Sequence, residues 1–442
     1  MNIYALSSGR GPTGIAIIRL SGKDTQKISK IISKKKNLKS QAINFCKFYD
    51  PLNNKLIDKG LLLWFPAPNS FTGDDLAEFH VHGSNAVILR FLKVLSEQEN
   101  CRLAEPGEFT KTAFQNNKID LIEAEGIADL IHSETELQRL QAVQLVQGTA
   151  STHYNNLREK LIKSLAYVEA KIDFGEDDLP ESILIEVQKT ITEVYIDIKK
   201  ILENHKIGEK IRDGFRVSIT GEVNAGKSSL LNLLSKRDVA IVSEEEGTTR
   251  DIIETYLNID GYPVILADTA GIRDSKNEVE KKGISLAINK SKEADLNLIM
   301  VDNSSKKVDL RIQKLMNENS IVVLNKSDIN RKQNHIFKEV DTILMSVKNN
   351  ENIDQLIKKI KEKLSKKVIC SNNILVTRER HRYKLQACMK EIENFLNKNK
   401  NKDLETAAED LRLATRHLGS IVGKVDVEEI LGSIFKDFCI GK

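Results

Sequence analysis

A glycine-rich loop limits the possible folds of this chain more than any other feature. The segment Gly221-Glu-Val-Asn-Ala-Gly-Lys-Ser228 follows an apolar run at Phe215–Thr220 and precedes a helical pattern at Ser229–Leu234. A phosphate-binding loop needs this order, because its backbone N–H groups surround phosphate oxygens between a strand and a helix N-terminus. The sequence therefore predicts a nucleotide domain of alternating strands and helices.

The side chains of this loop have separate predicted tasks. Lys227 is expected to place its charge on the β- and γ-phosphates, and the Ser228 hydroxyl to ligate Mg²⁺. The loop alone leaves ATP and GTP as open alternatives. Its predicted nucleotide contacts are Gly221, Asn224, Ala225, Gly226, Lys227, Ser228 and Ser229.

Two further segments are expected beside the phosphates. Asp268-Thr-Ala-Gly271 follows the apolar run Pro263–Ala267, so its carboxylate can hold a magnesium-bound water at the carboxyl end of a strand. Thr249, within Gly247-Thr-Thr-Arg-Asp251, is the predicted second Mg²⁺ ligand, in a loop that becomes ordered when the γ-phosphate is present. The predicted contacts here are Thr249, Asp268, Thr269, Ala270 and Gly271.

A third strand-end motif selects the base. Asn325-Lys-Ser-Asp328 follows an apolar run, and the Asp328 carboxylate can accept the ring N–H and the exocyclic amine of guanine, which adenine does not offer there. Asn325 is expected to fix the loop and the Lys326 stem to lie over the base. Ser346-Val347-Lys348 would supply a backbone N–H to the guanine oxygen. The ordered set predicts GTP.

The periodicity of apolar residues divides the chain into several regions, as expected for 442 residues. Residues 1–118 alternate short apolar runs with helical patterns and predict a small α/β domain. Residues 119–212 and 372–442 are helical, with one continuous helical pattern at Leu137–Phe174. Between them, residues 213–371 predict a parallel, doubly wound sheet, so the nucleotide domain is expected as an insertion within a helical domain.

Composition excludes some classes of function. A net charge of +4 is too small to predict nucleic-acid binding by itself, and the five cysteines have no spacing typical of a zinc site or a disulfide framework. No apolar run approaches membrane-spanning length, and the N-terminus lacks a signal-peptide pattern. We expect a cytoplasmic protein with reduced thiols and no membrane partner.

Additional motifs occur throughout the chain. They are Asp268-Thr-Ala-Gly-Ile-Arg273, Asn277-Glu-Val-Glu280, Cys439-Ile-Gly-Lys442, Gly14-Ile-Ala-Ile-Ile-Arg-Leu-Ser-Gly22, Ser70-Phe-Thr-Gly73, Glu105-Pro-Gly-Glu-Phe-Thr110 and Lys118-Ile-Asp-Leu-Ile-Glu-Ala-Glu125. With the nucleotide motifs, they make the whole chain resemble the MnmE family, also called TrmE, of tRNA-modifying GTPases.

The resemblance implies a fold, partners and a reaction. The fold would combine an N-terminal folate-binding domain that dimerises, a helical middle domain and an inserted Ras-like GTPase domain. In this family a homodimer and the flavin-dependent partner MnmG, also called GidA, form a heterotetramer. Together they add an aminomethyl or carboxymethylaminomethyl group to C5 of the wobble uridine of certain tRNAs. The one-carbon unit comes from 5-formyl- or 5,10-methylene-tetrahydrofolate.

The resemblance also implies how GTP is hydrolysed. Ile272 stands where Ras-like enzymes use a glutamine to orient water, so another group must do this, and Glu280 matches the family glutamate. A potassium ion would replace an arginine finger. Its implied ligands are Asn224, Ser243, Glu245 and Thr248, with Ser243 and Thr248 also counted as nucleotide contacts, and the predicted catalytic residues are Lys227, Gly271 and Glu280.

The same family match assigns a folate site to Arg19, Glu78, Lys118 and the terminal Lys442. Cys439, in the terminal motif, is either a chemically active thiol or an ordinary thiol in a mobile tail. Two alternatives to tRNA modification remain. The first is a ribosome-assembly GTPase related to Era or Der, although the KH domain or duplicated nucleotide domain of those proteins is not evident. The second is a GTP-gated scaffold, although Thr249, Asp268 and Glu280 favour retained hydrolysis.

Overall fold

The computed structural model describes residues 1–9, 11–173, 182–203, 205–222, 224–236, 240–241, 254–267, 293–305, 308–332, 337, 340–369, 375–398, 403–425 and 441. The chain forms two compact units. Unit 1 comprises Met1–Ala128, Leu145–Lys163 and Arg412–Lys442, and unit 2 comprises Asp129–Gln144 and Ser164–Leu411. Each unit therefore combines segments from distant parts of the sequence.

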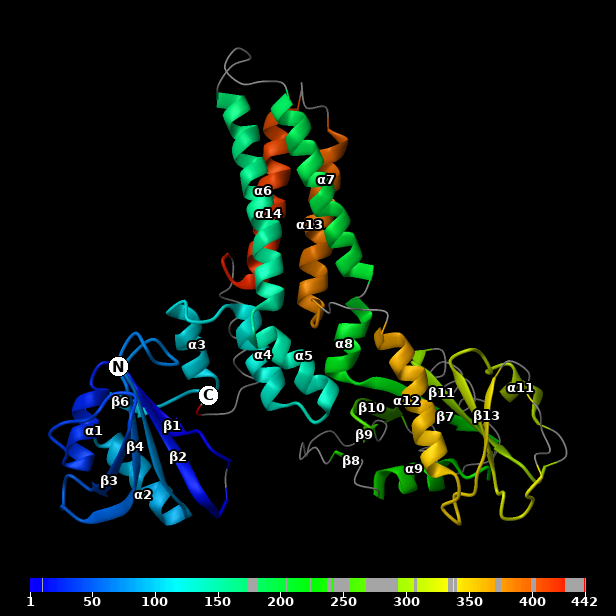
Figure 1. Ribbon diagram of the computed structural model, residues 1–442, viewed down its shortest axis with the longest axis horizontal. Coiled ribbons are helices and arrows are strands. Elements are labelled where there is room, and N and C mark those ends of the chain that lie inside the picture. The colour runs from blue at the N-terminus through cyan, green and yellow to red at the C-terminus, as the bar shows by residue number, and fades with distance from the viewer. Residues whose placement is uncertain are drawn as a thin grey trace, which may run out of the picture. The chain divides into compact units, whose positions relative to one another are not determined.

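Unit 1 contains a six-stranded sheet in the order β3-β4-β5-β2-β1-β6 (Figure 1). Its strands are β1 Asn2–Leu6, β2 Thr13–Ser21, β3 Ile43–Tyr49, β4 Leu56–Phe65, β5 Leu76–Gly83 and β6 Cys101–Leu103. Neighbouring strands are antiparallel except for β1 and β6. The short apolar runs that the sequence shows at Ile15–Leu20, Leu61–Phe65 and Glu78–Val81 lie in β2, β4 and β5, whereas β1, β3 and β6 were not predicted.

One face of this sheet is covered by α1 (Thr25–Ser33) and α2 (Asn85–Ser96). Alternate strand residues such as Ile18, Leu62 and Phe79 are fully buried, because successive side chains of a strand point to opposite faces. The sheet thus has one face packed on its helices, while Arg19 and Glu78 belong to the other set of alternate positions.

A glycine divides one predicted helical pattern. The sequence predicted continuous helix periodicity at Leu137–Phe174, but α5 ends at Val146 and α6 runs over Thr149–Asp173. Gly148 between them has a φ of 73°, a left-handed conformation that ends helices and that glycine adopts readily. The prediction was wrong here because one glycine within a helical pattern does not reveal its own backbone angle.

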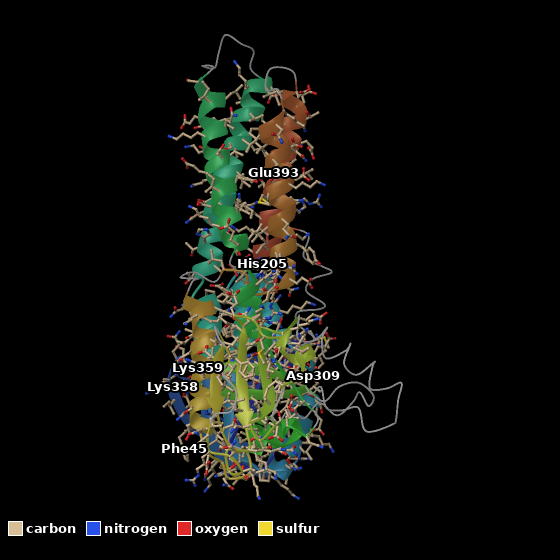
Figure 2. The ribbon with its side chains drawn as sticks, turned by 90° about the vertical axis from the view of Figure 1, so that its right-hand side faces the viewer. Phe45, His205, Asp309, Lys358, Lys359 and Glu393 are labelled. Carbon is tan, nitrogen blue, oxygen red and sulfur yellow. The ribbon has the colours of Figure 1, made fainter. Side chains whose placement is uncertain are left out.

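Helix α3 (Glu108–Gln115) still belongs to residues 1–118. The remaining helices of the helical region are α4 Leu121–Ile131, α7 Ser182–Glu203, α8 His205–Asp213, α13 Glu379–Asn397 and α14 Leu404–Val422. Helices α7 and α13 run side by side (Figure 1), and Tyr195 Oη donates to Glu393 Oε1 at 2.6 Å, with Glu393 labelled in Figure 2. None of the described helices is long and apolar enough to cross a membrane.

The nucleotide domain in unit 2 is built on a seven-stranded sheet in the order β13-β12-β11-β7-β10-β9-β8 (Figure 1). Its strands are β7 Phe215–Gly221, β8 Ala240–Ile241, β9 Glu254–Ile259, β10 Tyr262–Ala267, β11 Leu296–Asp302, β12 Ser320–Asn325 and β13 Asp341–Leu344. Five strands are parallel, as predicted, but β9 and β8 add an antiparallel edge. The sequence did not reveal the tight turn at Asp260 and Gly261 that reverses the chain between β9 and β10.

Helices cover both faces of this sheet. Helices α9 (Lys227–Lys236) and α12 (Ile353–Ile369) contribute to one apolar core, and residues beside α11 (Leu310–Gln313) pack on the opposite face. Burial on both faces explains why the central strands are continuously apolar. The strand order reverses at β7, which has β10 on one side and β11 on the other. Ligands bind at such reversal points, beyond the carboxyl ends of the strands.

Candidate functional site

The phosphate-binding loop leaves β7 at this reversal point. Gly221 has a φ of 147°, and a Cβ there would lie 2.1 Å from the Met300 carbonyl oxygen. Gly226 has a φ of 100°, and a Cβ would lie 2.3 Å from Asn325 Nδ2. Both glycines are therefore required by backbone angle and by close approach, because the loop packs directly on the ends of β11 and β12.

The loop ends where α9 begins. Lys227, the first residue of α9, directs its ammonium back over the loop and donates to the carbonyl oxygens of Gly221, at 3.1 Å, and Glu222, at 2.7 Å. Ser228 and Ser229 are exposed in the first helical turn, and Asn224 is exposed with a φ of 61°. The ammonium and the exposed hydroxyls thus gather at a helix N-terminus, where anions are stabilised.

Asn325 connects three loops through one side chain. It is 5% exposed, its Nδ2 donates to the Ala225 carbonyl at 2.8 Å, and its Oδ1 accepts from the Val347 N–H at 3.0 Å. The structure thus brings together the phosphate loop, the predicted base loop and the segment Ser346–Lys348. These contacts explain physically why an amide suits this position, since it must donate and accept at once.

Asp328 lies in the base loop with its carboxylate held from the neighbouring segment. Ser346 Oγ donates to Asp328 Oδ1 at 2.7 Å and also accepts from the Asn349 N–H at 3.2 Å. Ser346 is fully buried, Asp328 is half-buried, and Lys348 is exposed. A partly buried carboxylate with a fixed orientation is suited to pair with two parallel N–H donors.

Asp302 and Asn303, at the end of β11, belong to this region and were not predicted. Lys326 Nζ donates to Asp302 Oδ2 at 2.5 Å, and the buried Asn303 donates to the carbonyls of Asn330, at 2.8 Å, and Lys332, at 2.9 Å. The available signal was the position of Asp302 directly after an apolar strand, the same feature that singled out Asp268.

Several residues of the predicted sites lie in segments that the structure does not describe. The residues concerned are Ser243, Glu245, Thr248, Thr249, Asp268, Thr269, Ala270, Gly271 and Glu280, together with the terminal Cys439 and Lys442, all of which lie outside the described residues.

A separate group in unit 1 contains the positions expected to contact folate. Arg19 and Glu78 are direct partners in the β2–β5 register, and Arg19 Nε and Nη2 donate to Glu78 Oε1 at 3.0 and 2.8 Å. The guanidinium carbon lies 5.8 Å from the ring centroids of both Phe71 and Phe109. A guanidinium, a carboxylate and aromatic rings together form a donor, acceptor and stacking set suited to a flat heterocycle.

The other two positions expected to contact folate, Lys118 and Lys442, are not part of the Arg19–Glu78 pair. Lys118 is exposed, and its Nζ donates to the Pro68 carbonyl at 3.0 Å, in the loop that also carries Phe71. Lys442 is not described, but the preceding Gly441 is: its carbonyl accepts from Ser7 Oγ at 2.7 Å and from Arg19 Nη1 at 3.5 Å. The described end of the chain therefore lies beside Arg19.

Comparisons with known proteins cover the whole chain. The family model for the GTP-binding protein TrmE N-terminus matches residues 2–118, and the model for the MnmE helical domain matches residues 121–439. Among solved structures, the G domain of the T. maritima FeoB iron transporter aligns with 35% of this chain and 98% of its own length, at 22% identity and a TM-score of 0.26.

Two curated relatives align from end to end. A tRNA modification GTPase MnmE from Pelagibacter ubique (strain HTCC1062) is 58% identical over 445 residues, covering 100% of both chains. Another from Rickettsia bellii (strain RML369-C) is 43% identical over 446 residues, covering 100% of this chain and 99% of its own. The predicted resemblance is confirmed, and this chain belongs to the MnmE family of tRNA modification GTPases.

Proposed function

We propose that this chain is a potassium-activated GTPase that acts in the modification of the tRNA wobble uridine. The observation that carries the proposal is the convergence of the phosphate loop, Asp328 and the Ser346–Lys348 segment at one edge of a parallel sheet, joined by Asn325. This arrangement offers a phosphate site and a guanine-reading carboxylate within one connected framework.

The phosphate side would use residues already in place. Lys227 would move its ammonium from the loop carbonyls to the β- and γ-phosphates, an exchange of hydrogen-bond partners over a short path. Ser228 fits as a Mg²⁺ ligand, because its exposed hydroxyl lies in the first turn of α9, with Thr249 proposed as the second. A bound Mg²⁺ would neutralise developing phosphate charge.

Hydrolysis needs a further positive charge and an oriented water. Asn224 is exposed at the phosphate loop and is proposed to ligate potassium with Ser243, Glu245 and Thr248. Glu280 is proposed to orient the attacking water, since the apolar Ile272 cannot. Gly271, which lies between Asp268 and Ile272 in the sequence, is proposed as a further catalytic residue.

We extend the proposal to the assembly. Residues 1–118 would form the folate-binding and dimerising domain, residues 119–212 with 372–442 the helical domain, and residues 213–371 the GTPase domain. A homodimer would combine with the flavoprotein MnmG and act on tRNA. The names of the relatives support the tRNA reaction, and the family matches, which meet between residues 118 and 121, support a boundary after the N-terminal domain.

Folate binding is supported by the Arg19–Glu78 pair, whose guanidinium lies near the rings of both Phe71 and Phe109. Calorimetry with 5-formyltetrahydrofolate is expected to give a saturable heat that Glu78→Gln weakens, because one fixed acceptor is lost. Absence of heat at millimolar ligand, with the N-terminal domain folded, would contradict this part of the proposal.

The function as a whole is tested in cells lacking this chain. We expect the wobble uridine of the affected tRNAs to lack the aminomethyl-type groups, as measured by mass spectrometry of nucleosides. Wild-type chain should restore them, and Lys227→Ala, which removes the phosphate contact, should not. Full modification without the chain, accompanied by a ribosome-assembly defect, would favour the assembly-factor alternative instead.

A further inference from the structure

The carboxylate of Asp302 lies beside the base loop, on the neighbouring strand. In the parallel pairing of β11 and β12, Asp302 is the partner of Asn325, so both strands end at the same level. Lys326, the next residue, reaches across and donates from Nζ to Asp302 Oδ2 at 2.5 Å. The ion pair therefore spans two strand ends within the candidate guanine site.

Asp302 is well fixed for this contact. Its Oδ1 accepts from the Ser304 N–H at 2.8 Å and from Ser304 Oγ at 2.6 Å, which leaves Oδ2 directed to the lysine. The side chains of Asp302 and Lys326 are 19% and 29% exposed, so water screens the pair only in part. Burial would raise the pKa of Asp302, but the bonds from Lys326 and Ser304 outweigh it and hold that pKa below its usual value.

The backbone of Lys326 is also constrained. Its φ is 70°, a left-handed angle that is uncommon for residues other than glycine and persists where the surroundings impose it. Here Asn325 is fixed by its two side-chain bonds, and the Ser327 N–H donates to the Met345 carbonyl at 3.1 Å. The backbone thus fixes the start of the lysine side chain and Asp302 fixes its end.

We propose that Asp302 is a positioning residue for guanine binding. By holding the Lys326 ammonium it keeps the alkyl stem extended along the sheet edge, where the stem packs on the flat face of the base, while Asp328 pairs with the edge of the base. The inference deepens the proposed GTPase function and rests on it. Pre-ordering a flexible lysine removes an entropic penalty that binding would otherwise carry.

Asp302→Asn tests the proposal, because it keeps the shape and the Ser304 bonds but removes the charge. GDP affinity, measured with a fluorescent GDP in the full chain, is expected to fall about five- to tenfold, as for loss of an ion pair that water screens in part. At saturating GTP, kcat should stay within about twofold, since no reacting atom is touched. The preference for GTP over XTP should also remain, because Asp328 is intact.

A double-mutant cycle separates positioning from a general structural role. If Asp302 acts through Lys326, then Asp302→Asn should have almost no further effect once Lys326→Ala is present. Lys326→Met keeps an apolar stem but removes the ammonium, so it should lower GDP affinity to the same extent as Asp302→Asn. This second variant keeps the test decisive should Asp302→Asn fail to fold.

Asp341→Asn is the matched control. Asp341 also forms ion pairs, with Lys359 at 3.1 Å and Lys363 at 3.0 Å, but it is the first residue of β13, so it lies at the amino ends of the parallel strands, away from the carboxyl ends that carry the candidate guanine site. Both lysines belong to α12, and Figure 2 labels Lys359. GDP affinity should be unchanged in this variant. Wild-type affinity in Asp302→Asn or Lys326→Met, or an equal loss from Asp302→Asn with and without the Lys326 side chain, would overturn the inference. No GDP binding by the wild-type chain would overturn the proposed function as well.

Discussion

At the scale of single residues, the nucleotide site depends most on Asn325. Burying an amide costs little free energy while the amide both donates and accepts a hydrogen bond, but removing it leaves two buried partners without a hydrogen bond. The partners here are the Ala225 carbonyl and the Val347 N–H, one in the phosphate loop and one beside the base loop. Asn325 is therefore expected to set the relative position of the two halves of the site.

Asn325→Ala should destabilise the nucleotide domain by about 2–3 kcal/mol, the penalty for leaving buried polar groups unpaired. Hydrogen–deuterium exchange is the suitable measurement, because it resolves segments within a large chain. Protection should fall in the peptides around Ala225 and Val347, and GDP affinity should fall with it. Asn394→Ala, at an exposed position of α13, should leave both unchanged. Unaltered protection in Asn325→Ala would refute the role given to this amide.

Sequence alone was sufficient for residues whose chemistry is local to a motif. Asp328 and Lys227 were identified because strand, loop and residue type occur together in the chain. Asp302 was missed because its contact depends on β11 and β12 being neighbours, which is a property of the sheet order. The role of Ser346 in fixing the Asp328 carboxylate was missed for the same reason.

At the scale of elements, α3 shows how a family motif follows from local physics. Gly107, before the helix, has a φ of 69°, and Glu108 opens α3. Glu108 Oε2 accepts from Arg102 Nη1 and from the Glu105 N–H, each at 2.8 Å. The motif Glu105–Thr110 therefore combines a left-handed glycine with an acidic residue at a helix N-terminus, where negative charge is favourable.

The ion pair between Glu108 and Arg102 gives the N-terminal domain a pH-dependent stability. Burial acts to raise the pKa of Glu108, but bonds from Arg102 and the Glu105 N–H hold it below its usual value. The carboxylate thus adds stability above its unfolded pKa of about 4.3, and the gain disappears as pH falls through the lower folded pKa.

Glu108→Gln should lose about 1 kcal/mol at pH 7, and the difference from wild type should shrink toward zero at acid pH. Trp64 is the one tryptophan of the chain and is 3% exposed in β4, so its fluorescence reports unfolding of this domain. A difference between the two proteins that stays constant from pH 7 to about pH 3 would contradict the assigned pKa shift.

The types of the long elements were predictable, but some of their boundaries were not. Burial on both faces made the central strands of the nucleotide domain readable as apolar runs. The antiparallel β9 and the break at Gly148 depend on backbone angles at single turn residues, which periodicity does not report.

At the scale of the whole molecule, the two helical segments through which the chain enters and leaves the inserted nucleotide domain are held together. Arg212, in α8 on the entering side, and Arg378, before α13 on the leaving side, both donate to Asp129 Oδ1, at 3.1 and 2.7 Å. The Asp129 carboxylate therefore binds both the segment that enters the nucleotide domain and the segment that leaves it, as expected for a domain inserted between helical segments.

Potassium dependence also belongs to this scale, because the proposed ion loop is completed when two nucleotide domains meet. Potassium should raise both GTP turnover and dimerisation, whereas sodium, too small for the same ligands, should raise neither. Glu280→Ala should keep the potassium-dependent dimer but lose hydrolysis, since it affects the water and not the interface. Equal rates and equal oligomeric states in potassium and sodium chloride at matched ionic strength would contradict the proposal.

The proposed GTPase function with guanine recognition by Asp328 is tested most directly by nucleotide selectivity, measured as hydrolysis by the purified chain. Wild-type protein with Mg²⁺ and potassium should hydrolyse GTP and show at least about 100-fold lower kcat/KM for ATP, because adenine leaves the Asp328 carboxylate without its two donors. Asp328→Asn should transfer the preference to XTP, since the amide offers a donor to the xanthine oxygen. Equal use of GTP and ATP by the wild-type chain, or an Asp328→Asn variant that still prefers GTP to XTP, would contradict the account.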